Sequence, residues 1–162
     1  MRWLLLLCFF PAVASGQTDT TAFLYQSRTY DVMHHQRKAM YILGGWSTLS
    51  TGVGLYQLSS TSAFVRGMGV QNLAWGLIDG AITGYALYDL KKKEGKPIDL
   101  KLEQEKFRKV LLINTLLDVL YIGTGALLMQ HGNEKWRGHG QGIIIQGSFL
   151  FLFDGVNYAL TF

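Results

Sequence analysis

The feature that most constrains the fold is the stretch of residues 110–129, VLLINTLLDVLYIGTGALLM. It is almost wholly apolar, and as an α-helix it is long enough to cross the hydrocarbon core of a bilayer. Two polar residues, Asn114 and Asp118, interrupt it four positions apart and therefore share one helical face. A carboxyl group at that depth in lipid is costly, so Asp118 is expected to face other protein and to have a partner there.

Three further apolar stretches can supply that partner. Together they predict an all-α fold, a transmembrane four-helix bundle over residues 39–162, with spans at about residues 39–58, 67–88, 110–129 and 142–162. Between spans two and three the chain carries charges of both signs, and Gly95 and Pro97 are expected to separate the two flanking helices there. Between spans three and four, residues 130–140 are polar and glycine-rich and are predicted to form a loop.

The N-terminus has the pattern of a secretory signal peptide at residues 1–16, in which Arg2 precedes a short apolar run and small residues follow. An uncleaved anchor is the alternative. Residues 17–38 are polar, and a helix at the membrane interface is predicted within them. The only cysteine, Cys8, lies in the apolar run, so the chain can form neither an internal disulfide nor a thiolate metal site.

The charge of the chain leaves its orientation open. The net charge of +4 accompanies basic residues that flank apolar spans, as in membrane anchoring, and there is no nucleic-acid-binding motif. We therefore expect a lipid bilayer, and no nucleic acid, among the partners. A cleaved signal peptide places the mature N-terminus in the periplasm, at the bacterial inner (cytoplasmic) membrane. The positive-inside rule opposes this, because residues 89–109 carry eight Lys or Arg and would then face the periplasm. We follow the signal peptide.

Glycine is frequent, with 19 residues, and its spacing within the apolar stretches predicts close helix packing. Seven glycines are predicted to pack helices: Gly52, Gly54, Gly76, Gly80, Gly84, Gly123 and Gly125. A shift of 71 residues aligns span one with span three, and a shift of 75 then places Asp79 on Asp154. This pattern indicates an internal repeat, a duplicated two-helix unit that forms two similar helical hairpins about a pseudo-twofold axis along the membrane normal.

Several motifs resemble an uncharacterised family of small four-helix membrane proteins found mainly in Bacteroidota. They are LLINTLLDVLYIGTGALLM after Val110, then Arg137-Gly138-x-Gly140 and Ile145-Gln146-Gly147-x-Phe149-Leu150-x3-Asp154, and Met40-x-Ile42-Leu43-Gly44-Gly45-Trp46 at the start of span one. The resemblance covers about residues 25–162, although Ser50 and Asp79 stand where that family is expected to have Asn. It implies a signal peptide and this topology, and it implies no activity.

Six polar residues inside the predicted spans are the candidate functional residues: Asp79, Asp118, Asp154, Asn72, Asn114 and Gln146. One interpretation is a proton or cation path through a polar bundle interior. The other is structural, with hydrogen bonds between these side chains holding the helices together at about 1 kcal/mol each. The structural interpretation is favoured, because the sequence shows no long polar stripe.

No metal site and no cofactor are predicted. The pair His34 and His35 and the pair His131 and His139 are expected on opposite sides of the membrane, and no histidine lies in the middle of a span. Residues 138–142 are glycine-rich but lack the ending of a P-loop, so they are interpreted as the start of a helix. Six aromatic residues near the span ends are predicted interface anchors: Tyr41, Trp46, Tyr56, Tyr88, Trp136 and Tyr158.

The predicted function is that of a non-enzymatic structural or assembly component that binds either itself, as a homo-oligomer, or a larger membrane complex. The alternative is a small proton- or cation-conducting transporter or channel that uses Asp79, Asp118 and Asp154. No Ser-His-Asp or Cys-His arrangement indicates an enzyme. A dry, tightly packed bundle favours the first function, whereas a polar cavity reaching the three aspartates favours the second.

Overall fold

The computed structural model describes residues 31–162, and this part of the chain forms four long α-helices and no strand. The helices are α2 (Val32–Leu58), α3 (Ala63–Lys93), α4 (Leu100–His131) and α5 (Glu134–Ala159). The predicted all-α class is therefore confirmed for the described residues. The predicted signal peptide and most of the predicted interfacial segment lie outside them.

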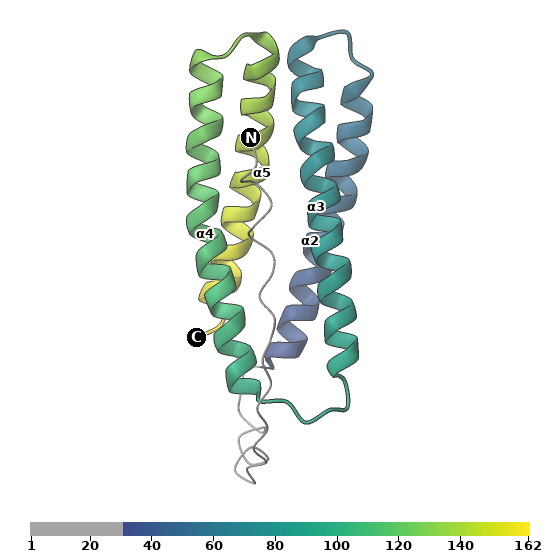
Figure 1. Cartoon of the computed structure of the whole chain (residues 1–162), viewed down its shortest axis with the longest axis vertical. Helices are drawn as coiled ribbons and strands as arrows, with labels where there is room; N and C mark the ends of the chain where they lie inside the picture. The colour runs from purple at the N-terminus through teal and green to yellow at the C-terminus, as the bar shows by residue number, and fades with distance from the viewer. Residues whose placement is uncertain (1–30) are drawn as a thin grey trace, which may run out of the picture.

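The four helices lie side by side along the long axis of the molecule as two antiparallel hairpins, α2–α3 and α4–α5 (Figure 1). The short turns within both hairpins lie at one end, which we call the turn end. The longer α3–α4 connection lies at the other end, which we call the connection end. Helix α3 packs along α5, whereas α2 and α4 touch only slightly. The two second helices of the hairpins therefore form the centre of the bundle.

Each helix begins at a side chain that caps it. Asp31, Ser62, Asp99 and Asn133 each accept a hydrogen bond from the backbone N–H three residues further on. Between α3 and α4, Gly95 has a positive φ of 71°, which a residue with a side chain rarely adopts. The prediction that this segment separates two helical extensions is confirmed, because α3 continues to Lys93 and α4 begins at Leu100.

The predicted loop at residues 130–140 is wrong. Only Gly132 and Asn133 separate α4 from α5, so the glycine-rich residues 138–142 are helical. Glycine disfavours helix when it is considered alone, but here its missing side chain allows close packing. A Cβ atom added at Gly140 would come within 2.6 Å of the backbone oxygen of Gly125 in α4. Tertiary packing thus overrides the local preference.

The two hairpins pack in the same way. A Cβ atom added at Gly54 would come within 2.5 Å of the backbone nitrogen of Leu73. In the second hairpin, a Cβ atom at Gly125 would come within 3.1 Å of the backbone nitrogen of Ile144, and both residues lie 71 positions after their counterparts. The same close contacts therefore recur at the predicted shift of 71, which supports the duplication.

The shift of 71 continues further than the sequence analysis expected. Gly76 approaches the backbone nitrogen of Thr51, to which an added Cβ atom would lie at 2.7 Å. A Cβ atom added at Gly147 would likewise lie 3.5 Å from the backbone nitrogen of Ile122. Gly147 lies 71 positions after Gly76, and Ile122 lies 71 positions after Thr51. The predicted change to a shift of 75 before this point is wrong, because the helix contacts keep one register to Gly76 and Gly147.

The contact between the hairpins is reciprocal. Gly67 of α3 lies against the backbone of Lys135, and Gly138 of α5 lies against the backbone of Phe64. Gly138 lies 71 positions after Gly67, and Lys135 lies 71 positions after Phe64. Two equivalent contacts of this kind are what a twofold relation produces. The α3–α5 contact is therefore the place through which the pseudo-twofold axis passes.

The structure separates the seven predicted packing glycines into two groups. Cβ atoms added at four of them would collide with a neighbouring helix: Gly54, Gly76, Gly80 and Gly125. At the other three, Gly52, Gly84 and Gly123, an added Cβ atom would meet no atom within 4 Å. The outward positions of these three follow from the helical period, and they pack against nothing within the described chain.

Candidate functional site

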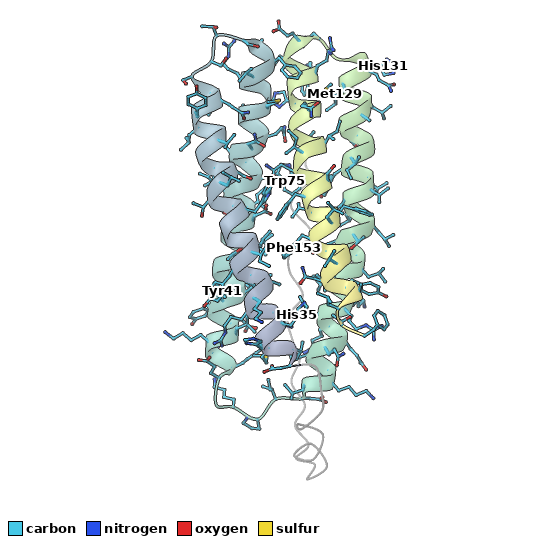
Figure 2. All side chains as sticks on the ribbon, turned by 180° about the vertical axis from the view of Figure 1, so that it is seen from behind. His35, Tyr41, Trp75, Met129, His131 and Phe153 are labelled. Atoms are coloured by element: carbon cyan, nitrogen blue, oxygen red, sulfur yellow. The ribbon has the colours of Figure 1, made fainter. Side chains whose placement is uncertain are left out.

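The interior of the bundle is more polar than apolar. Among the described residues, eleven polar or charged residues are buried against seven hydrophobic ones. The apolar cluster is small and consists of Ala39, Leu43, Leu150 and Phe153. In Figure 2, Phe153 and Trp75 lie between the two hairpins, and His35 and His131 lie at opposite ends of the bundle. The candidate site is therefore sought among the buried polar side chains.

Gln146 of α5 is the centre of one buried network, which we call the glutamine network. Its side-chain oxygen accepts a hydrogen bond from Trp46 Nε1 at 2.8 Å. Its side-chain nitrogen donates to Asn72 Oδ1 at 2.8 Å and to Ser50 Oγ at 3.1 Å. Asn72 in turn donates to Gln57 Oε1 at 2.7 Å. The network joins α2, α3 and α5.

Gln146 belongs to a longer row of buried polar residues on α5, which we call the polar seam: His139, Gln146, Asp154 and Asn157. Their spacings of seven, eight and three residues place them on one helical face. The rings and amides at the two ends of the seam are paired with other helices. Gln71 Nε2 lies 2.9 Å from His139 Nδ1, and His35 Nε2 lies 2.8 Å from Asn157 Oδ1.

The polar seam corrects the expectation that the chain lacks a long polar stripe. The expectation failed because glycines and apolar residues intervene between the polar residues in the sequence. Their helical spacing was the signal that could have found it. The predicted loop at residues 130–140 separates His139 from the rest of this stripe, whereas the helical start of α5 restores it.

Three aspartates from three helices form a second group, which we call the carboxyl cluster: Asp79 of α3, Asp118 of α4 and Asp154 of α5. They are 2%, 3% and 5% exposed. The side chains of Asp118 and Asp154 lie near each other, and Asp79 is close enough for its charge to interact with both. The structure thus brings together the three aspartates that the sequence analysis singled out.

Three buried oxygen atoms near the carboxyl cluster have no hydrogen-bond partner among the described residues. They are Oδ2 of Asp79, Oδ2 of Asp118 and Oγ1 of Thr83, which lies one helical turn beyond Asp79. Buried polar atoms are normally hydrogen-bonded, so unpartnered ones need an explanation. No group of three or more His, Cys, Asp or Glu side chains within residues 31–162 has the geometry of a metal site.

Two sequence assignments change with the structure. Asn114, predicted to share the role of Asp118, is only half-buried and joins neither the glutamine network nor the carboxyl cluster. Trp46, predicted as an interface anchor, stacks on Phe149 with ring centroids 3.9 Å apart and donates its N–H to Gln146 inside the bundle. Tyr56 is strongly exposed, as an anchor at the interface would be.

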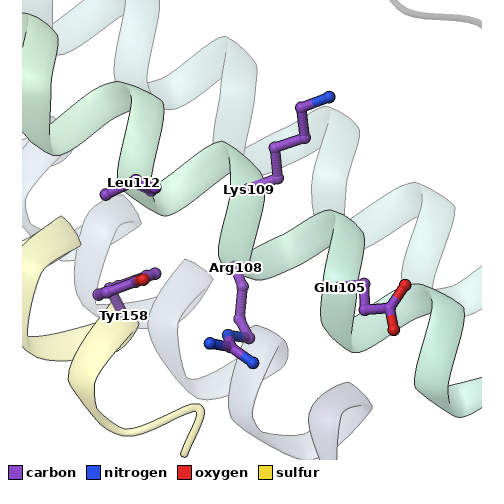
Figure 3. Close-up of a pocket in the computed structure, with 5 residues that line it drawn as sticks. All are labelled: Glu105, Arg108, Lys109, Leu112 and Tyr158. Atoms are coloured by element: carbon purple, nitrogen blue, oxygen red, sulfur yellow. The ribbon is translucent and has the colours of Figure 1, made fainter.

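Two shallow pockets lie at the ends of the bundle, and none of the three aspartates lines either of them. One pocket of about 240 Å³ lies at the connection end and is lined by Glu105, Arg108, Lys109, Leu112 and Tyr158. Figure 3 shows Arg108 and Lys109 leaving α4 in different directions there. The guanidinium of Arg108 lies 3.8 Å from the ring centroid of Phe162, a cation–π contact. A second pocket, of about 260 Å³, lies at the turn end near Arg66 and Lys135.

Ion pairs gather at the connection end. Lys93 of α3 contacts Asp89 at 2.8 Å and Glu103 of α4 at 2.7 Å, and Arg37 contacts Glu94. Burial lowers the pKa of Lys93, but the hydrogen bonds and charges of Asp89 and Glu103 outweigh it, so this pKa is raised overall. Of these pairs, only Lys93–Glu103 joins the two hairpins, and the other two lie within the first hairpin.

The fold and its interior define a class of protein: an all-helical bundle of two packed hairpins with a polar interior. In the described part of the chain, α4 and α5 are each long and apolar enough to cross a membrane. The family model for a family of unknown function, DUF6992, matches residues 42–155. Because this is more than two thirds of the chain, the protein belongs to that family. No match is found among the curated proteins or the solved structures.

The match confirms the prediction that the chain resembles an uncharacterised family. The distribution of that family in Bacteroidota stays a prediction. The name of the family assigns no chemistry, and the features that bear on function are the carboxyl cluster, the glutamine network and the outer surface.

Proposed function

We propose that the chain crosses the bacterial inner membrane with all four helices and acts there as a non-enzymatic assembly component. The observation that carries this proposal is the inverted distribution of side chains, polar inside and apolar outside. Water-soluble proteins show the opposite arrangement, because burial of apolar surface drives their folding. A bilayer removes that constraint and favours apolar residues on the surface.

The two helices of the first hairpin are the critical case, because α4 and α5 are already apolar enough to cross a membrane. On α2, Leu55 is 57% and Tyr56 is 81% exposed, and on α3 Leu77 is 60% and Tyr85 is 72% exposed. These helices have 27 and 31 residues, or about 40 and 46 Å, and the hydrocarbon core is about 30 Å thick. Length and surface both suit two further spans.

The assembly role is supported by the outer face of α2. Gly45, Thr48 and Gly52 are exposed there, and Cβ atoms added at the two glycines would meet nothing within 4 Å. Small outward residues allow the backbone of another helix to approach closely within a membrane. The counterparts of Gly45 and Thr48 on α4 are Leu116 and Val119, which are bulky. We therefore propose α2 as the helix that receives a partner helix, either from a second copy or from a larger complex.

The membrane part of the proposal is tested by single-cysteine labelling in intact cells, in a chain whose Cys8 is replaced. The variants Thr61→Cys and His131→Cys lie at the turn end, and Lys96→Cys lies in the α3–α4 connection. Four spans predict that an impermeant thiol reagent labels the first two alike and the third oppositely. The side that is labelled also decides between the signal peptide and the positive-inside rule. Equal labelling of all three would contradict the four-span arrangement.

The assembly part is tested by comparing Gly52→Leu with Gly123→Leu. The two glycines lie 71 positions apart, and both face outward with open space around them. If α2 is the docking helix, Gly52→Leu reduces the oligomer measured by native mass spectrometry in detergent, whereas Gly123→Leu leaves it unchanged. The same oligomer in both variants would contradict α2 as the docking helix. A monomeric wild-type chain would move the search to other membrane proteins.

The carboxyl cluster and the polar seam favour a second candidate function, the conduction of protons or cations. Buried carboxyl groups inside a membrane bundle commonly mark such pathways. The test is proton and cation flux into liposomes that contain the wild-type chain or the variant with Asp79, Asp118 and Asp154 all replaced by Asn. Flux that disappears in the variant supports conduction. Absence of flux in both, with both folded, leaves assembly as the function.

A further inference from the structure

We infer that the pocket at the turn end binds the phosphate of an anionic phospholipid headgroup, and we call it the headgroup pocket. It has a volume of about 260 Å³ and six lining residues: Leu58, Ala63, Arg66, Gly67, Val70 and Lys135. The inference names a ligand that the proposed function does not. It rests on the membrane part of that proposal, because the pocket meets a lipid only if the helices cross the bilayer.

Both charged residues of the headgroup pocket are positive. Arg66 lies in the first turn of α3 and Lys135 in the first turn of α5, and both are exposed. Neither forms an ion pair within residues 31–162. Glu134, the one acidic residue of this part of the chain at the turn end, accepts a hydrogen bond from Ser62 Oγ at 3.4 Å and does not line the pocket. Two cations, one from each hairpin, therefore share a pocket that an anion can neutralise.

The turn between α2 and α3 holds the arginine in place. Nη1 of Arg66 donates to the backbone oxygen of Ser60 at 2.8 Å and to that of Thr61 at 2.9 Å. These bonds leave the three N–H groups of Nε and Nη2 for another acceptor, and a guanidinium suits two oxygens of one phosphate. The pocket also lies at the N-terminal ends of α3 and α5, whose dipoles add positive potential there.

The apolar side of the headgroup pocket favours a lipid over a free phosphate. Leu58 and Val70 line the pocket beside the two cations, and Val70 is 41% exposed. Ala74 and Leu77 follow Val70 at four and seven positions and are exposed too, so the three residues share one outer face of α3. This face leads from the pocket towards the middle of the helix, where the acyl chain of a bound lipid can lie.

The duplication supplies a matched comparison for the headgroup pocket. The residue pairs related by the shift of 71 are Ala63 and Glu134, Phe64 and Lys135, and Arg66 and Arg137. The equivalent place on the other side of the pseudo-twofold axis thus has one cation beside an acidic residue, where the headgroup pocket has two cations and no acidic residue. We therefore expect an anionic lipid to bind at the headgroup pocket and not at its counterpart.

The experiment is native mass spectrometry of the purified full chain in detergent, with dioleoylphosphatidylglycerol or the zwitterionic dioleoylphosphatidylcholine added. The wild-type chain is expected to bind phosphatidylglycerol more tightly than phosphatidylcholine. Lys135→Gln should weaken the binding of phosphatidylglycerol about fivefold, the factor expected for one basic residue at an anionic lipid surface. The control Arg137→Gln removes one positive charge from the same exposed turn of α5 and should leave the binding unchanged.

Three results would overturn the inference. Equal binding of the two lipids would remove the headgroup preference, and equal weakening by Lys135→Gln and Arg137→Gln would reduce the binding to an effect of net charge. Displacement of the lipid by inorganic phosphate, at an ionic strength matched with chloride, would make a free anion the ligand. Circular dichroism checks that the variants fold, and the wild-type comparison of the two lipids decides even if one variant does not.

The failure of this inference is distinguishable from the failure of the proposed function. The cysteine-labelling experiment tests the four spans without reference to the class of lipid. Labelling as predicted, together with equal binding of the two lipids, would overturn the headgroup pocket alone. Equal labelling of all three cysteine positions would remove the membrane arrangement on which the headgroup pocket depends.

Discussion

The two hairpins share one backbone frame and differ in the polar side chains that it holds. In the first hairpin, Ser47 donates a hydrogen bond to the backbone oxygen of Gly76 at 2.7 Å. The residue 71 positions after Ser47 is Asp118, which lies near Asp154, the counterpart of Thr83. A serine and a threonine in one hairpin thus correspond to two aspartates in the other.

This difference separates packing from chemistry. The first hairpin shows that a hydroxyl group is enough to fill the interior position of Ser47, at a lower desolvation cost than a carboxyl group. Packing alone would therefore be served by the same residue types in the second hairpin. The aspartates add a property that the frame does not need, and this argument favours a role for them beyond helix association.

The outer surfaces of the two hairpins also differ in the size of their exposed side chains. The first hairpin exposes Gly45 and Thr48 on α2, where the second exposes Leu116 and Val119 on α4. The first hairpin is thus suited to contact with another helix, and the second holds two of the three members of the carboxyl cluster. We infer that the duplicated units divide the two proposed roles between them.

The largest effect is expected where the two hairpins meet. Gly138→Val places a side chain against the backbone of Phe64, which cannot move without displacing α3. Overpacking against backbone should lower the free energy of unfolding by more than about 3 kcal/mol, or prevent the hairpins from docking. Unfolding by SDS in mixed micelles, followed by circular dichroism, measures this loss. The control Gly123→Val adds the same side chain where the space is open, so equal losses in the two variants would contradict the reciprocal contact.

A smaller loss is expected from breaking the aspartate pair. Asp118→Leu leaves Asp154 buried without its partner, which should cost about 3 kcal/mol in the same unfolding assay. Asp118→Asn, whose amide can still donate to Asp154, should lie close to the wild type.

The double variant Asp118→Ser with Asp154→Thr gives the second hairpin the residues of the first. It is expected to fold with nearly wild-type stability in the same unfolding assay. If it unfolds as readily as Asp118→Leu, the aspartates are required for packing, and the separation of packing from chemistry is refuted.

A moderate loss is expected from the glutamine network. Gln146 corresponds to Trp75 of the first hairpin, which makes a ring contact with Tyr121 at a centroid distance of 5.1 Å. Gln146→Leu removes three hydrogen bonds and should cost about 1–2 kcal/mol, since each such bond within a membrane bundle is worth about 0.6 kcal/mol. The fluorescence of the tryptophans should change too, because Trp46 loses its acceptor. A matched Gln141→Leu variant, outside the network, tests whether the loss is specific.

Much of the fold could be predicted from the sequence, because long apolar stretches and a repeat at a fixed shift constrain helices strongly. Gly95 and Pro97 placed the break between α3 and α4 correctly. The start of α5 could not be predicted, because glycine at 138 and 140 reads as loop until the helix that packs against it is known. Hydrophobic periodicity indicates a helix. Whether a glycine ends that helix or packs it against another depends on the neighbouring helix.

The residues of the carboxyl cluster could be predicted from the sequence, but their arrangement could be predicted only in part. Asp79, Asp118 and Asp154 stood out because acids are rare in apolar stretches, and the structure brings them together. Trp46 and Thr83 were missed as site residues, because aromatic and hydroxyl side chains are ordinary in such helices. Their roles depend on which face of α2 or α3 is turned inward, and the inward face is set by the glycine contacts.

The smallest effect is expected at the ion pairs of Lys93, of which only the pair with Glu103 links the hairpins. Lys93→Met removes the contacts of Lys93 with Asp89 and Glu103, and a partly exposed pair of this kind is worth about 0.5 kcal/mol. Because the pKa of Lys93 is raised above its ordinary 10.5, its contribution is fully present below that pH and is lost as the pH rises through the higher value of the folded chain. The difference between wild type and Lys93→Met in the free energy of unfolding should therefore be constant through neutral pH and shrink only under strongly alkaline conditions. The exposed neighbour Lys92, which forms no ion pair in the described structure, gives the control Lys92→Met. If the difference in the free energy of unfolding instead changed with pH near neutrality, the stabilising charge would not be that of Lys93. The α3–α5 contact alone would then link the hairpins.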